Sequence, residues 1–462
     1  MRRFQPAILL ISAYALFLLA GILTLPLRIS EVLQLIGSFQ FSFSGLIGWI
    51  AQTPASAPLH YFVQLPFVLI GGYSRIAARL PSLLFALGSC YLFLQLARRI
   101  PLRRPYLALL LFMLVPLHYR FATQGRPFEQ ALFLTLLAAI WFLRLIETPD
   151  YRISAIYAAL LVLCLYTDAS SYLPSVGYLL FLLRFVHDPK LRRAVWFALP
   201  ATVIPGLLFL PYYFWAQPQA NPNWIFERNA FSPDLPVYLQ ALHGLGGGGW
   251  NGYVAGSLLL LGILGGAWAT FRPANSFTST PMTLFCLFGG VVSTIAIPIA
   301  ADTWNLLPFA ASQALWAVPG MIILFFNALD WLPQRQMSGP LMTALATLLI
   351  LLCALGDAAY LGYRREDMQA VAALVRPELK GDSCVVFVSE KLSKSLFILF
   401  DPELDKHECM TFFHPRVILA SHPYVRPDQQ EDAESYFRGL NFKETKRVRE
   451  GGGEIVVMEQ SK

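Results

Sequence analysis

Long apolar runs separated by short polar segments are the dominant pattern of the chain. Most runs have the length, roughly 18 to 25 residues, that a helix needs to cross a hydrocarbon core. A helix satisfies its own backbone hydrogen bonds in lipid, whereas a β-barrel would show short alternating segments. The pattern therefore predicts an all-α polytopic membrane bundle of about eleven transmembrane helices. These helices are predicted at 7–26, 78–97, 105–118, 128–146, 153–167, 172–186, 194–214, 253–271, 281–300, 308–329 and 340–361.

The last hundred residues or so follow a different pattern, because charged residues become frequent from residue 364. A helix-like segment at 366–375 precedes a strand-like apolar run at 384–388, and 455–458 has the character of a last strand. We therefore predict a membrane domain at 1–363 and a small soluble α/β domain at 364–462. The soluble part contains no Gly-rich phosphate loop and no recognisable catalytic constellation.

Composition and charge placement agree with a membrane protein. The chain has 462 residues, 56% of them hydrophobic and 14% charged, against about 25% charged in a soluble chain. The net charge of +7 does not indicate nucleic-acid binding, because Lys and Arg lie in short loops between apolar runs. Basic residues that predict a cytoplasmic side are Arg2, Arg3, Arg98, Arg99, Arg103, Arg104, Lys190, Arg192, Arg193, Arg272 and Arg335. The expected topology is a multi-pass protein of the plasma (inner) membrane with a cytoplasmic N-terminus, a retained first helix and an extracytoplasmic C-terminal domain.

Two external loops are long. The first, 27–77, contains an apolar segment at 59–72 that is too short to span and reads as a re-entrant or interfacial helix. The second, about 215–252, carries several tryptophans and the run Gly246 to Gly249. That glycine run fits either a mobile loop that closes over a ligand or a plain flexible connector.

Of the six cysteines, four lie in apolar runs and fit packing roles. Cys384 and Cys409 lie in the polar tail. They fit a disulfide if that domain is outside the cytoplasm, or else two unrelated buried thiols. No CxxC or His/Cys metal spacing occurs, so we predict no metal site, although a need for a divalent metal stays open.

Ionisable residues near the external helix ends are the candidates for chemistry. A carboxylate surrounded by arginines can take a proton from a hydroxyl while guanidinium groups hold a phosphate leaving group. An arginine at a helix end is, however, more often a snorkelling anchor. The candidates are Glu31, Arg75, Arg79, His118, Arg120, Gln124, Arg126, Glu129, Asp168 and Asp302.

Several short motifs, in this order and spacing, resemble the GT-C membrane glycosyltransferases. The branch in question contains protein O-mannosyltransferases and the lipid A aminoarabinose transferase, and typically reads PPLYY, RLPSxLFG, a basic helix end and QxARPY. The resemblance covers about 1–190. The matching segments are APLHY at 57–61, RLPSLLFAL at 79–87, LARR at 96–99, QGRPF at 124–128 and YTD at 166–168.

This resemblance implies a bundle of about a dozen helices with the active site under the first external loop. It implies inverting transfer of a sugar from a polyprenyl-phosphate donor to a lipid, glycan or protein at the external face. The family's catalytic Asp-Glu pair follows the first helix, and here Ser30-Glu31 occupies that place. Glu31 is therefore the candidate base, unless it merely pairs with Arg28 three residues earlier.

The remaining roles follow from position. Arg126 is the best phosphate candidate, because Pro127 should begin the fourth helix and a helix N-terminus favours an anion. Arg79 and Arg120 are expected to assist it. Candidates for substrate binding are His60, Tyr61, Gln124 and Asp168.

Two departures from the family favour an alternative function. The segment Thr53 to Ala57 lacks the family's Asp and His, and Ser312 to Trp316 lacks its Arg. With Ser30 in place of the Asp, the chain also fits a degenerate, non-catalytic member that binds a polyprenyl lipid or a partner protein. A transporter fits less well, because few charges lie within the predicted helices and no internal repeat is evident.

Overall fold

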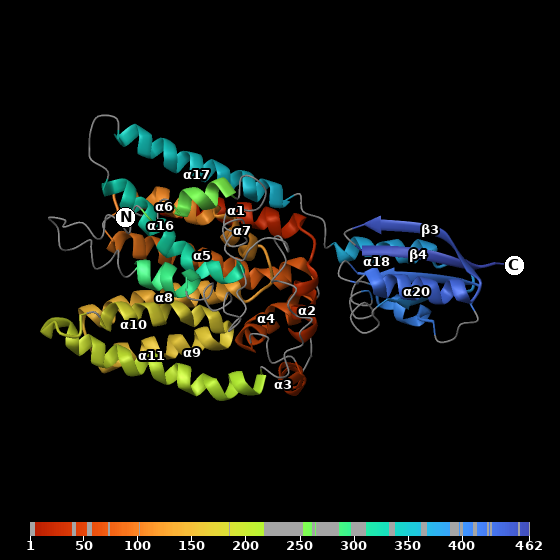
Figure 1. Cartoon of the computed structure of the whole chain (residues 1–462), viewed down its shortest axis with the longest axis horizontal. Coiled ribbons are helices and arrows are strands. Elements are labelled where there is room, and N and C mark those ends of the chain that lie inside the picture. The colour runs from red at the N-terminus through yellow and green to blue at the C-terminus, as the bar shows by residue number, and fades with distance from the viewer. Residues whose placement is uncertain are drawn as a thin grey trace. The chain divides into compact units, whose positions relative to one another are not determined.

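The computed structural model (Figure 1) divides into two compact units. One consists of Met1–Ile22 and Gly37–Leu361, and the other of Leu23–Ile36 and Gly362–Lys462. The described residues are 5–38, 43–52, 58–72, 74–100, 102–183, 185–216, 253–260, 264, 286–296, 311–331, 338–361, 367–388, 397, 401–409, 414–422, 425, 427–450 and 453–461. Several predicted features, including most of the second external loop, Thr53 to Ala57 and Asp302, lie outside them.

The first unit is helical. Its α-helices are α1 (Gln5–Thr24), α3 (Phe43–Gln52), α4 (Pro58–Gly71), α5 (Arg75–Arg99), α6 (Pro105–Leu114), α7 (Pro116–Ala122), α8 (Phe128–Glu147), α9 (Tyr151–Thr167), α10 (Leu173–Leu183), α11 (Pro189–Ala216), α16 (Val318–Trp331) and α17 (Ser338–Leu361). The described part of this unit also contains the 3-10 helices η1 (Ala169–Tyr172) and η5 (Ala311–Ala317) and the π-helix η4 (Cys286–Ala296). Helix α2 (Ile29–Ser38) belongs mostly to the second unit.

Among the described residues, five helices are long and apolar enough to cross a membrane, or six if the bent pair α6 and α7 forms one crossing. They are Pro6–Thr24, Arg75–Arg99, Phe128–Glu147, Leu191–Phe214 and Thr343–Leu361. These helices are consistent with the predicted multi-pass membrane protein. The number eleven stays a prediction, because parts of 253–271, 281–300 and 308–329 lie outside the described residues.

Local sequence explains two boundaries that shape the site. Ser74 begins α5 by accepting a hydrogen bond from the Ala77 N–H, as an N-cap residue does. Pro116 lacks an N–H and begins α7, and the chain bends by 61° between α6 and α7. The predicted single helix at 105–118 is therefore two helices, and the break brings the first residues of α7 into the interior.

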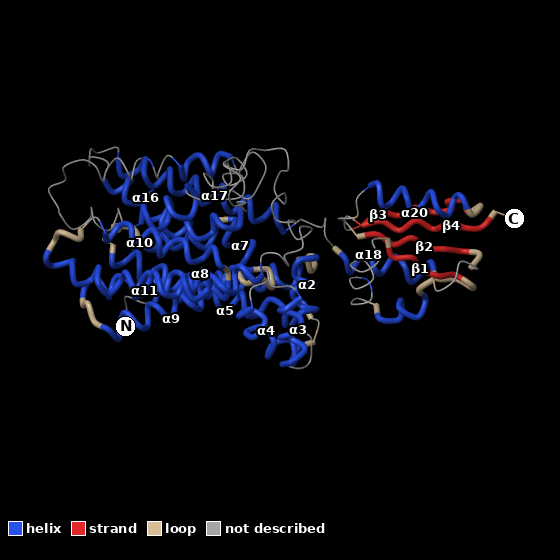
Figure 2. Tube along the Cα trace, turned by 60° about the horizontal axis from the view of Figure 1, so that its bottom comes forward, coloured by secondary structure: helices blue, strands red, loops and turns tan. Residues whose placement is uncertain are grey.

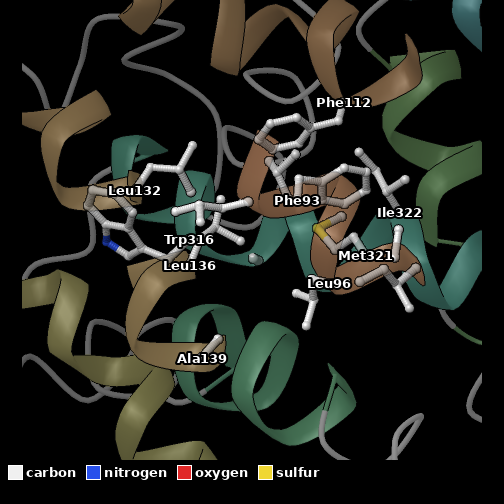
Figure 3. Close-up of a cluster of buried hydrophobic side chains, with 14 of the residues drawn as sticks. Phe93, Leu96, Phe112, Leu132, Leu136, Ala139, Trp316, Met321 and Ile322 are labelled. Carbon is white, nitrogen blue, oxygen red and sulfur yellow. The ribbon is translucent and has the colours of Figure 1, made fainter. Parts of the chain in front are cut away.

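The core of the first unit joins α5, α6, α8 and α16 (Figure 3). Phe93 of α5 stacks on Phe112 of α6 with ring centroids 4.5 Å apart. Leu132 and Leu136 of α8 lie in the same cluster. Large apolar side chains on α1 and α11 remain exposed, as expected for helices that face lipid on one side.

The second unit contains a mixed four-stranded sheet (Figure 2), as predicted in outline. The strands are β1 (Ser383–Phe387), β2 (Arg416–Ser421), β3 (Phe442–Glu450) and β4 (Gly453–Gln460), in the order β1-β2-β4-β3. Only the β1–β2 pair is parallel. In Figure 2 the sheet lies between α18 (Met368–Val375) and α20 (Pro427–Gly439). Cys384 and Cys409 form a disulfide, which decides between the two alternatives that the sequence left open.

Candidate active site at one end of the helical bundle

Polar side chains of the first unit gather at the end of the bundle where α1 and α17 finish and α5 and α8 begin. The hydrogen bonds between these elements establish the grouping. Arg79 of α5 donates from Nη1 to the Ile22 carbonyl of α1 at 3.2 Å. Gln124, which follows α7, donates from Nε2 to the Tyr360 hydroxyl of α17 at 3.0 Å. Residues predicted from separate motifs thus lie at one end of the bundle.

Arg79 is almost fully buried, with 1% of its surface exposed. Ile22 lies in the last turn of α1, whose carbonyls have no partner within the helix. The guanidinium therefore caps α1 as well as bringing a positive charge into the interior. That structural role does not depend on substrate.

The QGRPF segment packs directly against the beginning of α5. A Cβ atom on Gly125 would lie 2.6 Å from the Ala78 carbonyl oxygen, so only glycine allows this approach. The Ser82 hydroxyl donates to the Arg126 carbonyl oxygen at 3.2 Å. Two of the motifs that carry the family resemblance are therefore in contact. The contact fixes the backbone of Arg126 at the start of α8.

Arg126 lies one residue before the N-cap of α8, Pro127. Its guanidinium carbon is 5.1 Å from the ring centroid of Phe128. A guanidinium stacked on an aromatic face keeps its donors directed sideways, where they can meet an anion. The α8 N-terminus adds a favourable field for negative charge. These observations agree with the predicted phosphate role, which remains a prediction.

His60 of α4 is fully buried next to this loop. Its Nδ1 lies 3.0 Å from Gln130 Oε1 on α8. The pKa of His60 is lowered to about 4, chiefly by burial and also by the charge of Arg126, while hydrogen bonds to Gln130 and to the Gly125 backbone act in the opposite direction. The imidazole is therefore neutral at physiological pH. The neighbouring Tyr61 is also buried and packs on Leu46 and Ile50 of α3.

Arg120 and Asp168 have local contacts. The Arg120 guanidinium carbon is 5.9 Å from the ring centroid of Phe121. Asp168 follows α9, and its Oδ1 accepts hydrogen bonds from the Ser170 N–H at 2.8 Å and the Ser170 hydroxyl at 2.5 Å. Asp168 thus caps η1, as aspartate commonly does at a helix start. Their predicted roles toward a substrate stay predictions.

Glu31 lies in the first turn of α2 and has no exposed surface. Its Oε2 accepts a hydrogen bond from the Arg28 backbone N–H at 3.0 Å. This is the reciprocal half of a capping box, in which a glutamate three residues into the helix reaches back to the N-cap. Glu31 is therefore joined to the backbone of Arg28 by this hydrogen bond. Its role as a base stays a prediction.

Buried carboxyl groups form a second polar cluster. Glu129 Oε2 lies 3.3 Å from His118 Nε2, with no exposed surface on either side chain. The Tyr14 hydroxyl lies 3.1 Å from His118 Nδ1. Asp357 of α17 is fully buried, and neither carboxyl oxygen has a hydrogen-bond partner among the described residues. Asp357 was not among the predicted candidates, although an aspartate within the apolar run 340–361 is itself an indication of function.

No group of three or more His, Cys, Asp and Glu side chains that could hold a metal ion occurs within the described part of the chain.

Comparison with family models gives no match to this sequence, and no curated protein matches it. Solved structures do match. ArnT from Cupriavidus metallidurans in the apo state has a TM-score of 0.59 and 14% identity, with 97% of each chain covered. The same protein bound to undecaprenyl phosphate gives a TM-score of 0.59 and 12% identity, again over 97% of each chain.

A second protein of known structure has a similar fold over about two thirds of its own chain. The archaeal oligosaccharyltransferase AglB from Archaeoglobus fulgidus, in complex with an inhibitory peptide and a dolichol-phosphate, gives a TM-score of 0.51 and 10% identity. The match covers 90% of this chain and 69% of AglB. Identities this low establish a shared fold and nothing finer. The chain therefore has the fold of the GT-C membrane glycosyltransferases, as its motifs predicted.

Proposed function

We propose that the protein transfers a sugar, with inversion, from a polyprenyl-phosphate-linked donor to a lipid, glycan or protein acceptor at the external face of the plasma membrane. The observation that carries the proposal is the shared fold. ArnT, similar over 97% of this chain, is solved with undecaprenyl phosphate, and AglB is solved with a dolichol-phosphate. Two different proteins with this fold thus hold the same class of lipid phosphate.

The polar end of the first unit suits the phosphate of such a donor. Arg126 is half-buried beside the N-terminus of α8, where a phosphate gains both charge-assisted hydrogen bonds and the helix field. Arg79 and Arg120 add positive charge on neighbouring helices. The prenyl chain itself needs only lipid and apolar side chains, which the exposed apolar surface of the bundle supplies.

In the proposed reaction Glu31 removes the proton from the acceptor hydroxyl as its oxygen bonds to the anomeric carbon. The bond from that carbon to the phosphate oxygen breaks on the opposite side, and the electron pair leaves with the polyprenyl phosphate.

The disulfide supports the proposed topology. Disulfides persist outside the cytoplasm and are rare within it. Cys384–Cys409 in the second unit therefore fits an extracytoplasmic C-terminal domain, and with it the cytoplasmic N-terminus that the basic loops predict.

Binding and turnover are best tested on the same purified proteins. Radiolabelled undecaprenyl phosphate should bind the wild type, and Arg126→Ala should weaken binding by about 10- to 100-fold, the loss of a charged hydrogen bond worth about 1.5–3 kcal/mol. Arg103→Ala, in the opposite, predicted cytoplasmic loop, is the control and should bind normally. Unchanged binding by Arg126→Ala would exclude that residue from the phosphate site.

Glu31→Gln should bind the lipid and lose transfer. Full activity in this variant would show that Glu31 is not the base. Saturable binding by the wild type without transfer from any donor would favour the alternative function. That alternative is a degenerate member that binds a polyprenyl lipid or a partner protein, and the serine at position 30 is the observation that favours it.

A further inference from the structure

Arginines that lie over aromatic rings gather at one end of the helical bundle. The guanidinium carbon of Arg144 on α8 is 4.7 Å from the ring centroid of Trp141. That of Arg193 on α11 is 5.9 Å from the ring centroid of Phe197. Two similar pairs, each at 5.6 Å, lie where α5 ends and where α9 begins. The four Arg–aromatic pairs, as we call them, are Arg98–Tyr106, Arg144–Trp141, Arg152–Tyr151 and Arg193–Phe197.

Contacts between the helices show that these pairs share one end of the bundle. Arg99 at the end of α5 forms an ion pair with Glu147 at the end of α8, with 3.3 Å between Nη1 and Oε1. The Ser154 hydroxyl, in the first turn of α9, donates to the Phe197 carbonyl oxygen of α11 at 3.0 Å. In Figure 1 this is the left end of the bundle, where α10 turns into α11.

The candidate active site lies at the opposite end of the same helices. Arg126 comes just before α8, and Arg144 lies in the last turn of that helix, eighteen positions later. A rise of about 1.5 Å per residue separates the two by about 27 Å, which is close to the thickness of a hydrocarbon core, about 30 Å. The two ends therefore fit the two faces of a membrane. The basic loops predict that the end with the Arg–aromatic pairs is cytoplasmic.

Three of the guanidinium groups can meet a partner from outside the protein. Arg144, Arg152 and Arg193 are exposed, and within the described residues no carboxylate forms an ion pair with their side chains. A guanidinium that lies over an aromatic ring keeps its N–H groups directed sideways, where two of them can donate to one phosphate. The stacked arrangement thus prepares these side chains for an anion that carries phosphate oxygens.

The charge at this end is strongly positive. Segments 98–106, 141–152 and 188–197 hold nine Lys and Arg residues against three Asp and Glu residues, a surplus of six positive charges. Of the three carboxylates, Glu147 is paired with Arg99. Asp150 accepts a hydrogen bond from the Arg152 backbone N–H at 3.1 Å as the N-cap of α9. A surplus of this size attracts an anionic membrane surface.

The same helices bring these charges to the boundary of the hydrocarbon core. Trp196, next to the Arg193–Phe197 pair, is 68% exposed. Further along the helices, Ile156 on α9 and Ile204 on α11 are exposed apolar side chains. A tryptophan at a helix end beside exposed apolar residues is typical of the interface between membrane and water. The Arg–aromatic pairs therefore fit the level of the lipid headgroups.

We propose that the Arg–aromatic pairs are a binding surface for anionic phospholipids, whose phosphate groups accept hydrogen bonds from Arg144, Arg152 and Arg193. A zwitterionic phospholipid carries the same phosphate, but its ammonium group cancels the charge, so the positive surplus favours anionic headgroups. The inference does not rest on the proposed function, because it concerns the opposite end of the bundle and involves no sugar transfer.

The surface is tested on the full-length protein in detergent by native mass spectrometry, with phosphatidylglycerol and phosphatidylcholine as the probes. The wild type should bind phosphatidylglycerol at least about tenfold more tightly than phosphatidylcholine. Arg144→Gln combined with Arg193→Gln should lose about fivefold or more in affinity for phosphatidylglycerol, since one basic residue near an anionic surface contributes about 1 kcal/mol. Its affinity for phosphatidylcholine should stay the same.

Two further variants separate the surface from net charge. Lys380→Gln combined with Lys443→Gln removes the same charge from exposed positions of the second unit and should bind both lipids as the wild type does. Arg144→Lys combined with Arg193→Lys keeps the charge but loses the planar group that stacks and donates in pairs. This variant should lie between the wild type and the glutamine variant, and wild-type affinity in it would refute the role of the stacked arginines.

Other outcomes would also overturn the proposal. Equal affinity of the wild type for the two lipids would leave the arginines as snorkelling anchors. An equal loss in the Lys380 and Lys443 control would show that net charge, and not this surface, binds the lipid. Wild-type binding of inorganic pyrophosphate without binding of phosphatidylglycerol would assign the surface to a soluble anion.

Undecaprenyl phosphate keeps this test separate from the proposed function. The variant with glutamine at both arginines should bind undecaprenyl phosphate normally, and Arg126→Ala should bind phosphatidylglycerol normally. Loss of phosphatidylglycerol binding in Arg126→Ala, with wild-type binding in the glutamine variant, would refute the surface proposed here. Normal binding of undecaprenyl phosphate by Arg126→Ala would count against the phosphate site alone.

Discussion

The buried pair of His118 and Glu129 gives the sharpest prediction about stability. The two side chains are 3.3 Å apart with no exposed surface, and they join α7 to α8. Two opposite unit charges at that distance, with an effective dielectric constant of about 20, would attract each other by about 5 kcal/mol. Desolvation offsets much of this attraction, so the pair adds little net stability. Removal of one partner, however, leaves a buried charge uncompensated and costs about 3–5 kcal/mol.

His118→Leu should therefore lower the free energy of unfolding by about 3–5 kcal/mol, and Glu129→Leu by a similar amount. The double variant should lose clearly less than the sum, because no charge is left behind. Unfolding by SDS in mixed micelles, followed by tryptophan fluorescence, measures all three.

The control is the Arg99–Glu147 pair, which has the same 3.3 Å separation but side chains that are 29% and 60% exposed. Arg99→Gln should cost at most about 1 kcal/mol. Single losses below about 1 kcal/mol at the buried pair, or strict additivity in its double variant, would refute the reasoning.

Three further predictions test separate parts of the structure. Gly125→Ala should lower the free energy of unfolding by about 1–3 kcal/mol in the same assay, because its Cβ would lie 2.6 Å from the Ala78 carbonyl oxygen. The control is Gly48→Ala, whose Cβ would meet nothing within 4 Å and which should be neutral or stabilising. Equal effects of the two substitutions would contradict the close contact at Gly125. Asp357→Leu should raise the free energy of unfolding by about 1–3 kcal/mol, because both carboxyl oxygens are buried without partners in the described structure. A lower free energy of unfolding in this variant would show that the carboxyl group has a partner. Burial lowers the pKa of His422 to about 4, so the second unit should lose up to about 3 kcal/mol as the pH falls from about 6.5 to 4. Hydrogen exchange of the β2 amides, measured between these pH values, reports the loss of stability. The loss should be smaller in His422→Leu. Exchange that does not depend on pH in the wild type would contradict the prediction.

Much of the architecture could be predicted from apolar run length alone. The runs at 78–97 and 128–146 became α5 and α8, because nothing within them interrupts a helix except proline early in α5. The broken helix at Pro116 was not predicted, since a proline inside an apolar run can either kink a helix or end it. The outcome depends on what packs around the break.

In the second unit, the strands with buried apolar residues, β1, β2 and β4, coincide with apolar pieces of the sequence. Strand β3 does not, because most of Phe442–Glu450 is charged and exposed. Charges on an edge strand discourage pairing with other chains, and they also hide the strand from an analysis based on hydrophobicity.

The candidate site was predictable where residues lie close in sequence. The motifs placed Arg79 and Arg126 at the same end of the bundle, and a hydrogen bond from Ser82 to the Arg126 carbonyl joins their segments in the structure. The contacts of Gln130 with Thr167 and with His60 were not predictable, because they join residues 37 and 70 positions apart in the chain. The unusual position of Asp357 within an apolar run could be predicted from the sequence, but the absence of hydrogen-bond partners in the described structure could not.

The most direct test of the account is release of polyprenyl phosphate by the purified wild type in nanodiscs, with a panel of radiolabelled polyprenyl-phosphate sugars and Glu31→Gln in parallel. The account predicts release from at least one donor by the wild type and none by Glu31→Gln. Saturable donor binding with no release by either protein would contradict the proposed transfer and identify the chain as a binding protein with a glycosyltransferase fold.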